Sequence, residues 1–370
     1  MPPSWLVTDE PHRLGSGWLS GTVAAVLGLA ALGTAACFAA PDLLTTPALR
    51  AWYPLPLVRT ALAAAIVLAV LLGAVSLVLR RKKTLGATAL GSATLATAIW
   101  SLAPAPSGTG GTGGLAVDVF VLNLLVYTAL FVPLERLWPL RSEQPTFRAE
   151  WWTDLAWFVV SALSLQVTAL LVLRPAEALA FAIVPTVQDA VSALPLPVQF
   201  AAIVVVADVV QYWVHRACHR VPLLWRFHAI HHSATAMDWL AGSRLHTVDA
   251  LLTRALVYAP LFVLGFDALA VGAYLVFVAA QATFVHANVA FRLGWLEPFL
   301  VTPRFHHWHH ADAPTDRNFA VHLPWLDRLF GTFHLPAAAW PERYGLAAPA
   351  VGPRGFWRQF AAPFAGRTAR

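Results

Sequence analysis

The segment that decides the fold is residues 198–219, VQFAAIVVVADVVQYWVHRACH. Its first part is almost entirely apolar, and it continues without a helix breaker into His215 and His219. An apolar stretch of about 20 residues is long enough to cross a bilayer as a helix. Because positions four apart lie on the same face of a helix, the two imidazoles are predicted to project together beyond one end of a membrane span.

The composition of the whole chain is that of a membrane protein. Its 370 residues are 58% hydrophobic and only 12% charged, with a mean hydropathy of +0.63, whereas a soluble domain carries about 25% charged residues. The pI near 9.8 comes without an aromatic and basic recognition motif, so nucleic acid is not an expected partner. Two distant cysteines, Cys37 and Cys218, exclude a disulfide framework and a thiolate metal site. Besides the first segment, apolar runs predict spans over about 18–40, 60–79, 85–102, 115–133 and 155–173, and a helical hairpin over 250–266 and 269–285.

A Pro- and Gly-rich stretch divides the chain. Residues 104–114, PAPSGTGGTGG, have the composition of a flexible linker. We therefore predict a membrane module of about three transmembrane helices in 1–114, a catalytic domain in 115–340 and a cytosolic tail in 341–370. The predicted fold class is all-α: a polytopic membrane helical bundle with a cytosolic, histidine-lined metal cap, preceded by the extra N-terminal module.

The distribution of basic residues predicts the orientation in the membrane. Arg80-Arg81-Lys82-Lys83 is the densest basic run, and the positive-inside rule places it in the cytosol. Counting spans from there leaves the uncharged linker outside and brings His215 back to the cytosolic side. All the dense histidine clusters then lie on the cytoplasmic face.

Two further histidine clusters share the helical spacing of the first. They read His228-Ala-Ile-His231-His232 and His306-His307-Trp308-His309-His310. Offsets of three and four residues place the histidines of each cluster on one helix face, except His307, which points about 100° away from His306. Neutral imidazole suits iron, copper, zinc and nickel. Eight to ten imidazoles are too many for one ion, so the pattern predicts two ions, and zinc by itself cannot perform redox chemistry.

Other chemistries fit the pattern less well. Neither Glu-x-x-His nor His-Glu-x-x-His occurs. A metal transporter would need ligands along a path open to both faces of the bilayer, and an inactive scaffold would be expected to have lost cluster residues. His12, His322 and His334 lack a partner on the same helix face, although His322 could line the mouth of the site.

At this point the sequence resembles a known family. The three clusters resemble the histidine boxes of the fatty acid hydroxylase / sterol desaturase superfamily, and the resemblance covers about residues 115–340. It implies a four-helix membrane core under a cytosolic cap that holds two iron ions, with dioxygen as co-substrate. It also implies a fatty acyl, sterol, carotenoid or ether-lipid substrate. The flanking residues that agree are Asp208, Tyr212, Trp213, Ser233, Arg244, His286-Ala-Asn288, Thr302-Pro303, Asn318-Phe319 and Trp325-Leu-Asp327-Arg-Leu-Phe-Gly331-Thr332.

The resemblance implies a residue-level site. Where relatives often have Pro and then Glu after the equivalent of His246, this chain has Thr247, Val248 and Asp249. The expected metal ligands are His215, His219, His228, His231, His232, His306, His309, His310, His286 and His246. The candidates to hydrogen-bond the ligand imidazoles are Asp208, Asn288, Asp312, Asp316, Asn318 and Asp327. The candidates to line the substrate site are Tyr212, Trp239 and Phe284.

These observations predict an integral membrane di-iron oxidoreductase that hydroxylates or desaturates a lipid, either sterol-like or fatty acyl. Ether-lipid or carotenoid oxygenation on the same site is the alternative enzyme, and a metal transporter or an inactive scaffold is the alternative outside enzymology. Zinc could replace iron in the isolated protein. Because no Pro-Gly-Gly haem-binding segment follows any histidine, the resemblance implies a separate electron donor, a ferredoxin or a cytochrome b-type protein.

Overall fold

The computed structural model describes residues 15–46, 50, 52–102, 117–168, 185–337, 339–347 and 352–365. All regular elements in these ranges are helices, as predicted. The chain divides into two compact units, Met1–Ala129 and Leu130–Arg370. The predicted boundaries at residues 114 and 340 stay predictions.

The first unit is a bundle of three long helices built on small residues. It consists of α1 (Trp18–Ala39), α4 (Leu55–Leu79) and α5 (Thr84–Leu102), with the short α2 (Pro41–Leu44) after α1. A Cβ atom added at Gly28 would lie only 2.9 Å from the Ala89 carbonyl oxygen. Such close approach is how helices pack inside a bilayer, where burial of apolar surface alone gives little driving force.

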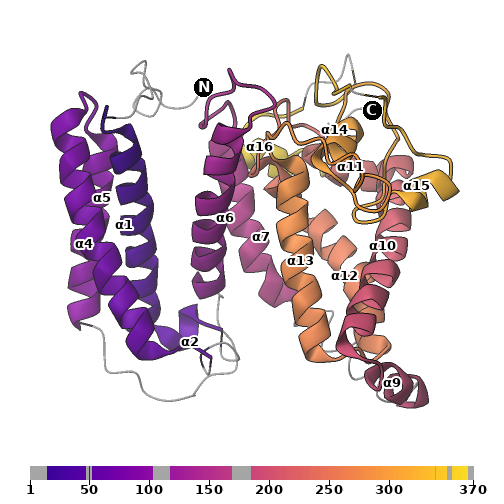
Figure 1. The fold of residues 1–370 in the computed structure, drawn as a ribbon, viewed down its shortest axis with the longest axis horizontal. Helices are drawn as coiled ribbons and strands as arrows, with labels where there is room; N and C mark the ends of the chain where they lie inside the picture. The colour runs from indigo at the N-terminus through magenta and orange to yellow at the C-terminus, as the bar shows by residue number, and fades with distance from the viewer. Residues whose placement is uncertain are drawn as a thin grey trace. The chain divides into compact units, whose positions relative to one another are not determined.

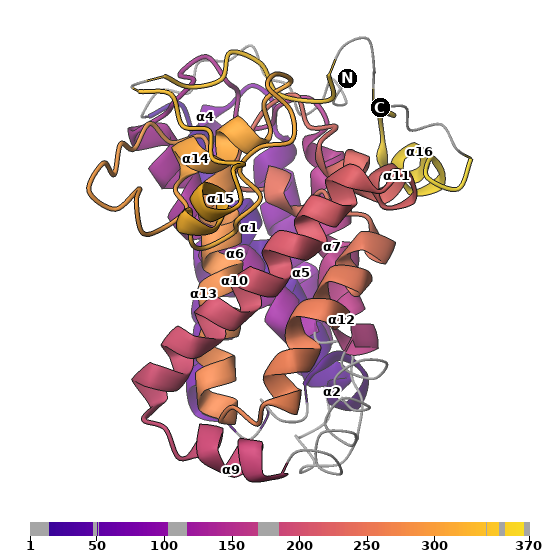
Figure 2. The same cartoon turned by 90° about the vertical axis from the view of Figure 1, so that its right-hand side faces the viewer.

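The second unit contains the helices that carry the histidines. Helix α6 (Val117–Leu137) leads into it, and α7 (Trp151–Thr168) and α9 (Pro185–Ser192) follow. Helices α10 (Leu196–Arg220), α12 (Thr247–Val263) and α13 (Ala268–His286) come next. Figure 2 shows α10 lying across α12 and α13, with α9 at the far end of the three. The core of this packing is apolar and includes the buried residues Ile203, Ala207, Val257, Leu261, Ala270 and Tyr274.

Six helices of the described residues are long and apolar enough to cross a membrane. They confirm a multi-pass membrane protein. The predicted hairpin is present as α12 and α13, and its turn uses Gly265 at φ 74° and Asp267 as the N-cap of α13. Residues 169–173 of the predicted fifth span lie outside the described residues. The six helices are Trp18–Ala39, Leu55–Leu79, Thr84–Leu102, Phe120–Leu137, Leu196–Arg220 and Ala268–His286.

Short helices form a cap at one end of the second unit. They are α11 (Pro222–His231), the 3₁₀ turn η2 (Ala241–Ser243), α14 (Pro303–His309), α15 (Trp325–Leu329) and α16 (Phe356–Ala361). Figure 1 shows α11, α14 and α15 gathered where α10 and α13 end, opposite α9. Helices α11 and α14 both begin with proline, whose fixed φ suits the first helical turn. Helix α11 packs against the end of α10 and α14 packs against α13, so both bring their histidines to the ends of the long helices.

Candidate metal centre

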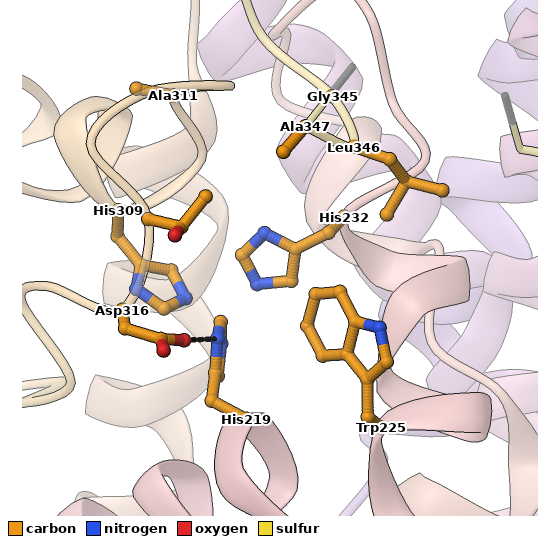
Figure 3. A pocket seen from close by; sticks show the side chains of 10 residues that line it. His219, Trp225, His232, His309, Ala311, Asp316, Gly345, Leu346 and Ala347 are labelled. Carbon is orange, nitrogen blue, oxygen red and sulfur yellow. Dashed lines mark ion pairs between the residues drawn. The ribbon is translucent and has the colours of Figure 1, made fainter. Parts of the chain in front are cut away.

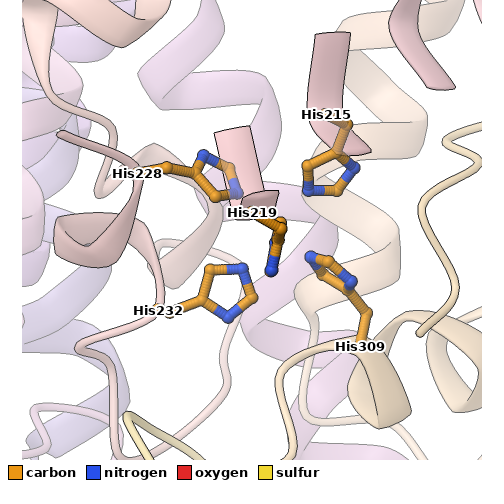
Figure 4. Close-up of side chains that lie close together, drawn as sticks. All are labelled: His215, His219, His228, His232 and His309. Atoms are coloured by element: carbon orange, nitrogen blue, oxygen red, sulfur yellow. The ribbon is translucent and has the colours of Figure 1, made fainter. Parts of the chain in front are cut away.

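The first group of histidines joins three helices. His215 and His219 come from the end of α10, His228 and His232 from α11 and the residue after it, and His309 from α14. One ligand nitrogen from each of the five lies within 4.8 Å of all the others. Figure 4 shows the five rings facing a common centre. All five side chains are buried, so the centre is screened from bulk water.

The second group lies directly beside the first and uses α11, α13 and α14. Its Nε2 atoms converge: His286 Nε2 is 3.0 Å from that of His306, 3.1 Å from that of His310 and 3.4 Å from that of His231. Neighbours in sequence go to different groups, because successive helical positions point about 100° apart. His231 and His232 divide in this way, and so do His309 and His310.

Backbone carbonyls orient four of the histidines. The Nδ1 atom of His215 lies 2.8 Å from the Phe319 oxygen, that of His231 lies 3.0 Å from the Arg244 oxygen, and that of His309 lies 2.7 Å from the Arg317 oxygen. In the second group, His286 Nδ1 lies 2.6 Å from the Ala282 oxygen. Since a carbonyl oxygen can only accept a hydrogen bond, Nδ1 must carry the proton in each ring. The lone pair is then on Nε2, which faces the group, as a metal ligand requires.

Two carboxylates orient two more ligands. Asp249 Oδ2 lies 2.8 Å from His228 Nδ1, and Asp316 Oδ1 lies 3.3 Å from His219 Nδ1. A carboxylate that accepts the Nδ1 proton fixes the tautomer and makes the imidazole a stronger ligand. Six of the nine histidines in the two groups thus have Nδ1 beside an oxygen acceptor, which leaves their Nε2 atoms for the candidate metal positions.

The electrostatic environment keeps the cap histidines neutral. Burial lowers the pKa of each well below its ordinary value, and the neighbouring histidines lower it further. Neutral imidazole is the form that binds a metal. The cap histidines with this shift are His231, His232, His306, His309 and His310.

Metal ions fit this donor set. The Nε2 atoms of His228, His232 and His309 are buried and have no hydrogen-bond partner among the described residues. Leaving a buried polar atom unpaired costs about 1–3 kcal/mol, and a cation at the first group would satisfy these lone pairs. An all-imidazole set suits iron, copper, zinc and nickel.

Nine of the ten predicted ligands are brought together, and His246 is not. Its Nε2 lies 3.1 Å from the Phe360 oxygen, and its Nδ1 accepts the Val248 N–H as the N-cap of α12. Both ring nitrogens are therefore occupied by protein atoms, and we leave His246 out of the ligand set. His307 is also outside both groups, with Nδ1 2.9 Å from the Tyr344 hydroxyl.

The residues expected to hydrogen-bond ligand imidazoles mostly hold backbone instead. Asp208 accepts the N–H groups of residues 321, 322 and 323. Asp327 accepts those of Phe319 and Ala320. Both carboxylates hold the loop whose Phe319 carbonyl orients His215, so they act one step away from the imidazole.

The other four candidates have different contacts. Asp316 is the one that meets an imidazole, that of His219. Asn318 bonds the backbone of Phe305 and His334, Asn288 bonds the backbone of Arg141, and Asp312 pairs with Arg343. Asp249, the partner of His228, was missed because no motif joins two residues that are 21 positions apart.

The three candidates for lining the substrate site lie in packed surroundings. The Tyr212 hydroxyl is 2.8 Å from Thr332 Oγ1 on a fully buried side chain. Trp239 is buried, and Phe284 packs on Phe291. A cavity of about 150 Å³ reaches the first histidine group at a different place, on the side of α11 and the 311–316 loop. Figure 3 shows its lining, which consists of His219, Trp225, His232, His309, Ala311, Thr315, Asp316, Gly345, Leu346 and Ala347.

The membrane-spanning helices of the described residues define a polytopic membrane protein, and the two groups of buried imidazoles at one end of its second unit form a candidate metal centre. The fatty acid hydroxylase family model matches residues 200–332. The chain is 30% identical over 263 residues to ornithine lipid hydroxylase OlsE of Rhizobium tropici, covering 67% of this chain and 75% of that protein. The chain therefore belongs to the fatty acid hydroxylase / sterol desaturase superfamily, and it is an oxidoreductase.

Other relatives match a smaller part of the chain. Alkylglycerol monooxygenase of Danio rerio is 31% identical over 156 residues, which are 40% of this chain and 33% of that protein. Methylsterol monooxygenase 1 of Danio rerio is 27% identical over 130 residues, which are 35% of this chain and 44% of that protein. The match thus spans less than half the length of either relative. No solved structure matches the chain significantly.

Proposed function

We propose that this protein is a di-iron monooxygenase that hydroxylates an acylated polar membrane lipid with dioxygen and electrons from a separate carrier protein. The observation that carries the proposal is the pair of buried groups, of five and four imidazoles, that share α11 and α14. Two metals held side by side in this way can act on one oxygen molecule.

Iron at both centres would supply the dioxygen chemistry, and the protein supplies position and dryness. The reaction consumes one dioxygen, two electrons and two protons; one oxygen atom enters the lipid C–H bond and the other leaves as water. Nine neutral imidazoles would hold the metals, while Asp249, Asp316 and four backbone carbonyls keep six of the rings turned inward. Burial of all nine rings keeps water away from the reaction.

The cytoplasmic face is proposed for the metal centre because basic residues collect at that end of the second unit. Arg216, Arg220 and Arg226 stand at the end of α10 and in α11. By contrast, residues 185–215 and 255–291, which include the α9 end, contain no lysine or arginine. The positive-inside rule assigns the basic end to the cytoplasm.

The relatives support the choice of lipids to test. Ornithine lipid hydroxylase OlsE aligns with 75% of its length, so an ornithine-type acyl lipid is the first substrate to test. An ether lipid is the second, because alkylglycerol monooxygenase of Danio rerio is 31% identical to this chain over 156 residues. A fatty acyl or sterol substrate, and desaturation in place of hydroxylation, remain within the same proposed chemistry.

The test begins with the metal. Purified protein in detergent should hold about two irons per chain, since imidazole sets of five and four ligands are present. His309→Ala should lower occupancy of the first group, and His306→Ala that of the second. His334→Ala, outside both groups, is the matched control. Little iron in the folded parent protein would refute the proposal.

The second step tests the reaction. Membranes with the parent protein, a reductant and isotopically labelled dioxygen should produce a lipid that carries one labelled oxygen atom. The product's mass spectrum identifies which lipid is oxidised and separates an alcohol from an alkene, which takes up no oxygen. A labelled product that forms equally with His306→Ala would show that the proposed centre does not perform the reaction.

A further inference from the structure

Electrons must reach metals that lie deep in the protein. All nine histidines of the two groups have less than a tenth of their surface exposed, from His310 at 1% to His231 at 8%. A carrier protein cannot touch such a centre directly. The route must therefore pass through a side chain that contacts the ligands and also reaches the surface.

Trp225 on α11 meets both requirements. Its ring centroid lies 5.1 Å from that of His219 and 5.6 Å from that of His232, two ligands of the first group. The side chain is only partly buried. Figure 3 shows its indole beside both imidazoles on the wall of the cavity. One conjugated ring thus connects the protein surface with the first metal position.

The surface around this tryptophan is basic. Arg226 follows it in sequence and is exposed. Arg220, at the end of α10, has 57% of its side chain exposed and lies 3.6 Å from Asp316, which is 34% exposed. Asp316 is also 3.3 Å from His219 and so faces inward as well as outward. The outward charge of this corner is therefore positive.

We infer that the corner formed by the end of α10 and by α11 is the docking surface for an acidic one-electron carrier protein, and that Trp225 passes its electrons to the first metal position. Arg220 and Arg226 would attract the carrier, since complementary charge raises the association rate of proteins. The inference rests on the proposed function, because only a redox metal centre needs such a carrier.

The electron balance is simple. Each reduced carrier loses one electron to a ferric ion, which becomes ferrous, and two such transfers supply the two electrons that one hydroxylation consumes. No bond to Trp225 forms or breaks. The tryptophan must only remain in contact with His219 and His232.

The same arginines could instead bind lipid phosphates, since Val221 and Leu223 nearby are exposed and apolar. The contact of Trp225 with His219 and His232 favours binding of a carrier protein, because lipid binding does not require an aromatic side chain beside the metal position. Lipid binding is accordingly one outcome of the test.

The experiment measures electron transfer without substrate. The full-length protein is loaded with ferric iron in nanodiscs of neutral lipid. It is then mixed without oxygen with a reduced acidic ferredoxin or a reduced acidic cytochrome b5 haem domain, and carrier oxidation is followed by absorbance. All rates are normalised to bound iron. Dithionite, which needs no docking surface, measures whether the iron can be reduced at all.

Two sets of variants separate docking from transfer. Arg220→Gln/Arg226→Gln should lower the second-order rate at low ionic strength by about tenfold, and added salt should remove the difference. Arg354→Gln/Arg358→Gln, on and beside α16, is the matched control and should react like the parent. Trp225→Leu should lower the rate at saturating carrier, and Trp225→Phe, which keeps an aromatic ring, should retain most of it.

Each outcome has a clear meaning. Equal rates for the parent and the double-arginine variant, or no transfer from either carrier while dithionite still reduces the iron, would overturn the docking surface. An unchanged limiting rate in Trp225→Leu would overturn the route. A defect that appears only in nanodiscs with anionic lipid would show that the arginines bind lipid instead. Iron that dithionite cannot reduce, or absent iron, would count against the proposed function itself.

Discussion

Replacing Asp249 by asparagine should weaken metal binding at the first histidine group and leave the second group intact. Asp249 Oδ2 accepts the His228 Nδ1 proton at 2.8 Å, and the two side chains are only 3% and 7% exposed. Such a pair is poorly screened by solvent. Asparagine has nearly the same shape and can still accept the proton, but it lacks the charge, which makes a hydrogen bond about twice as strong.

The expected loss of metal affinity follows from the position of Asp249, which contacts one histidine of the first group on the side away from the metal position. Loss of a carboxylate partner behind a ligating histidine typically lowers metal affinity by about 10–100-fold, which is about 1.4–2.7 kcal/mol. Among the described residues, no hydrogen bond joins Asp249 to a histidine of the second group. The Asp249→Asn change should therefore lower the metal affinity of the first group and leave that of the second group unchanged.

The assay is competition with a chelator at equilibrium. Iron or cobalt per chain is measured as chelator concentration rises, for the parent and for Asp249→Asn. The variant should pass through a plateau of about one metal per chain. Asp267→Asn is the control, because Asp267 caps α13 at the end away from its histidine. Parallel loss of both metals, or an unchanged titration, would refute the assignment of Asp249 to one group.

Gly242→Ala should destabilise the cap, because the added Cβ would lie 2.8 Å from His286 Nδ1. Overpacking of this kind costs about 1–3 kcal/mol of folding free energy. Thermal unfolding measures this loss, and Gly272→Ala, where nothing lies within 4 Å of the added Cβ, is the control. Asp154→Ala should cost about 3–5 kcal/mol, because it leaves the buried Arg148 and Arg244 without their shared carboxylate; a melting temperature equal to that of the parent would contradict the buried network. The metal-free protein should lose stability as pH falls below about 6.5, the ordinary histidine value. Burial depresses the pKa of the cap histidines in the folded state, so the unfolded chain takes up protons that the folded chain does not. Melting temperatures between pH 8 and pH 5 test this, and a flat profile would show that these rings are not buried as neutral groups.

Much of the fold and of the candidate site could be predicted from local patterns. Apolar runs of membrane length appear in the structure as α1, α4, α5, α6, α10 and α13. The hairpin predicted over 250–266 and 269–285 is present, with Gly265 in its turn and Asp267 as the N-cap of its second helix. In each case the deciding interactions lie within one or two helical turns, so sequence spacing is enough to identify them.

The site was less predictable wherever contacts cross the chain. Asp208 and Asp327 were expected beside imidazoles, yet each binds the backbone of the 319–323 loop. Apart from the predicted Asp316, the imidazole partners are Asp249 and the carbonyls of Arg244, Ala282, Arg317 and Phe319. Every residue has a carbonyl, so no side-chain pattern can single out the four that orient a histidine.

The sequence by itself determined that this protein spans a membrane and carries three helical histidine clusters, because both properties depend on periodicity along one helix. Only the tertiary structure decided how the histidines divide. His231 and His232 are adjacent in the chain but belong to different groups, and His286 joins the second group from a separate helix. His246 has the same chemistry and stays outside. Helix periodicity determines the helix face on which a side chain lies. Membership of a histidine group depends instead on how the ends of α10, α11, α13 and α14 are arranged in space.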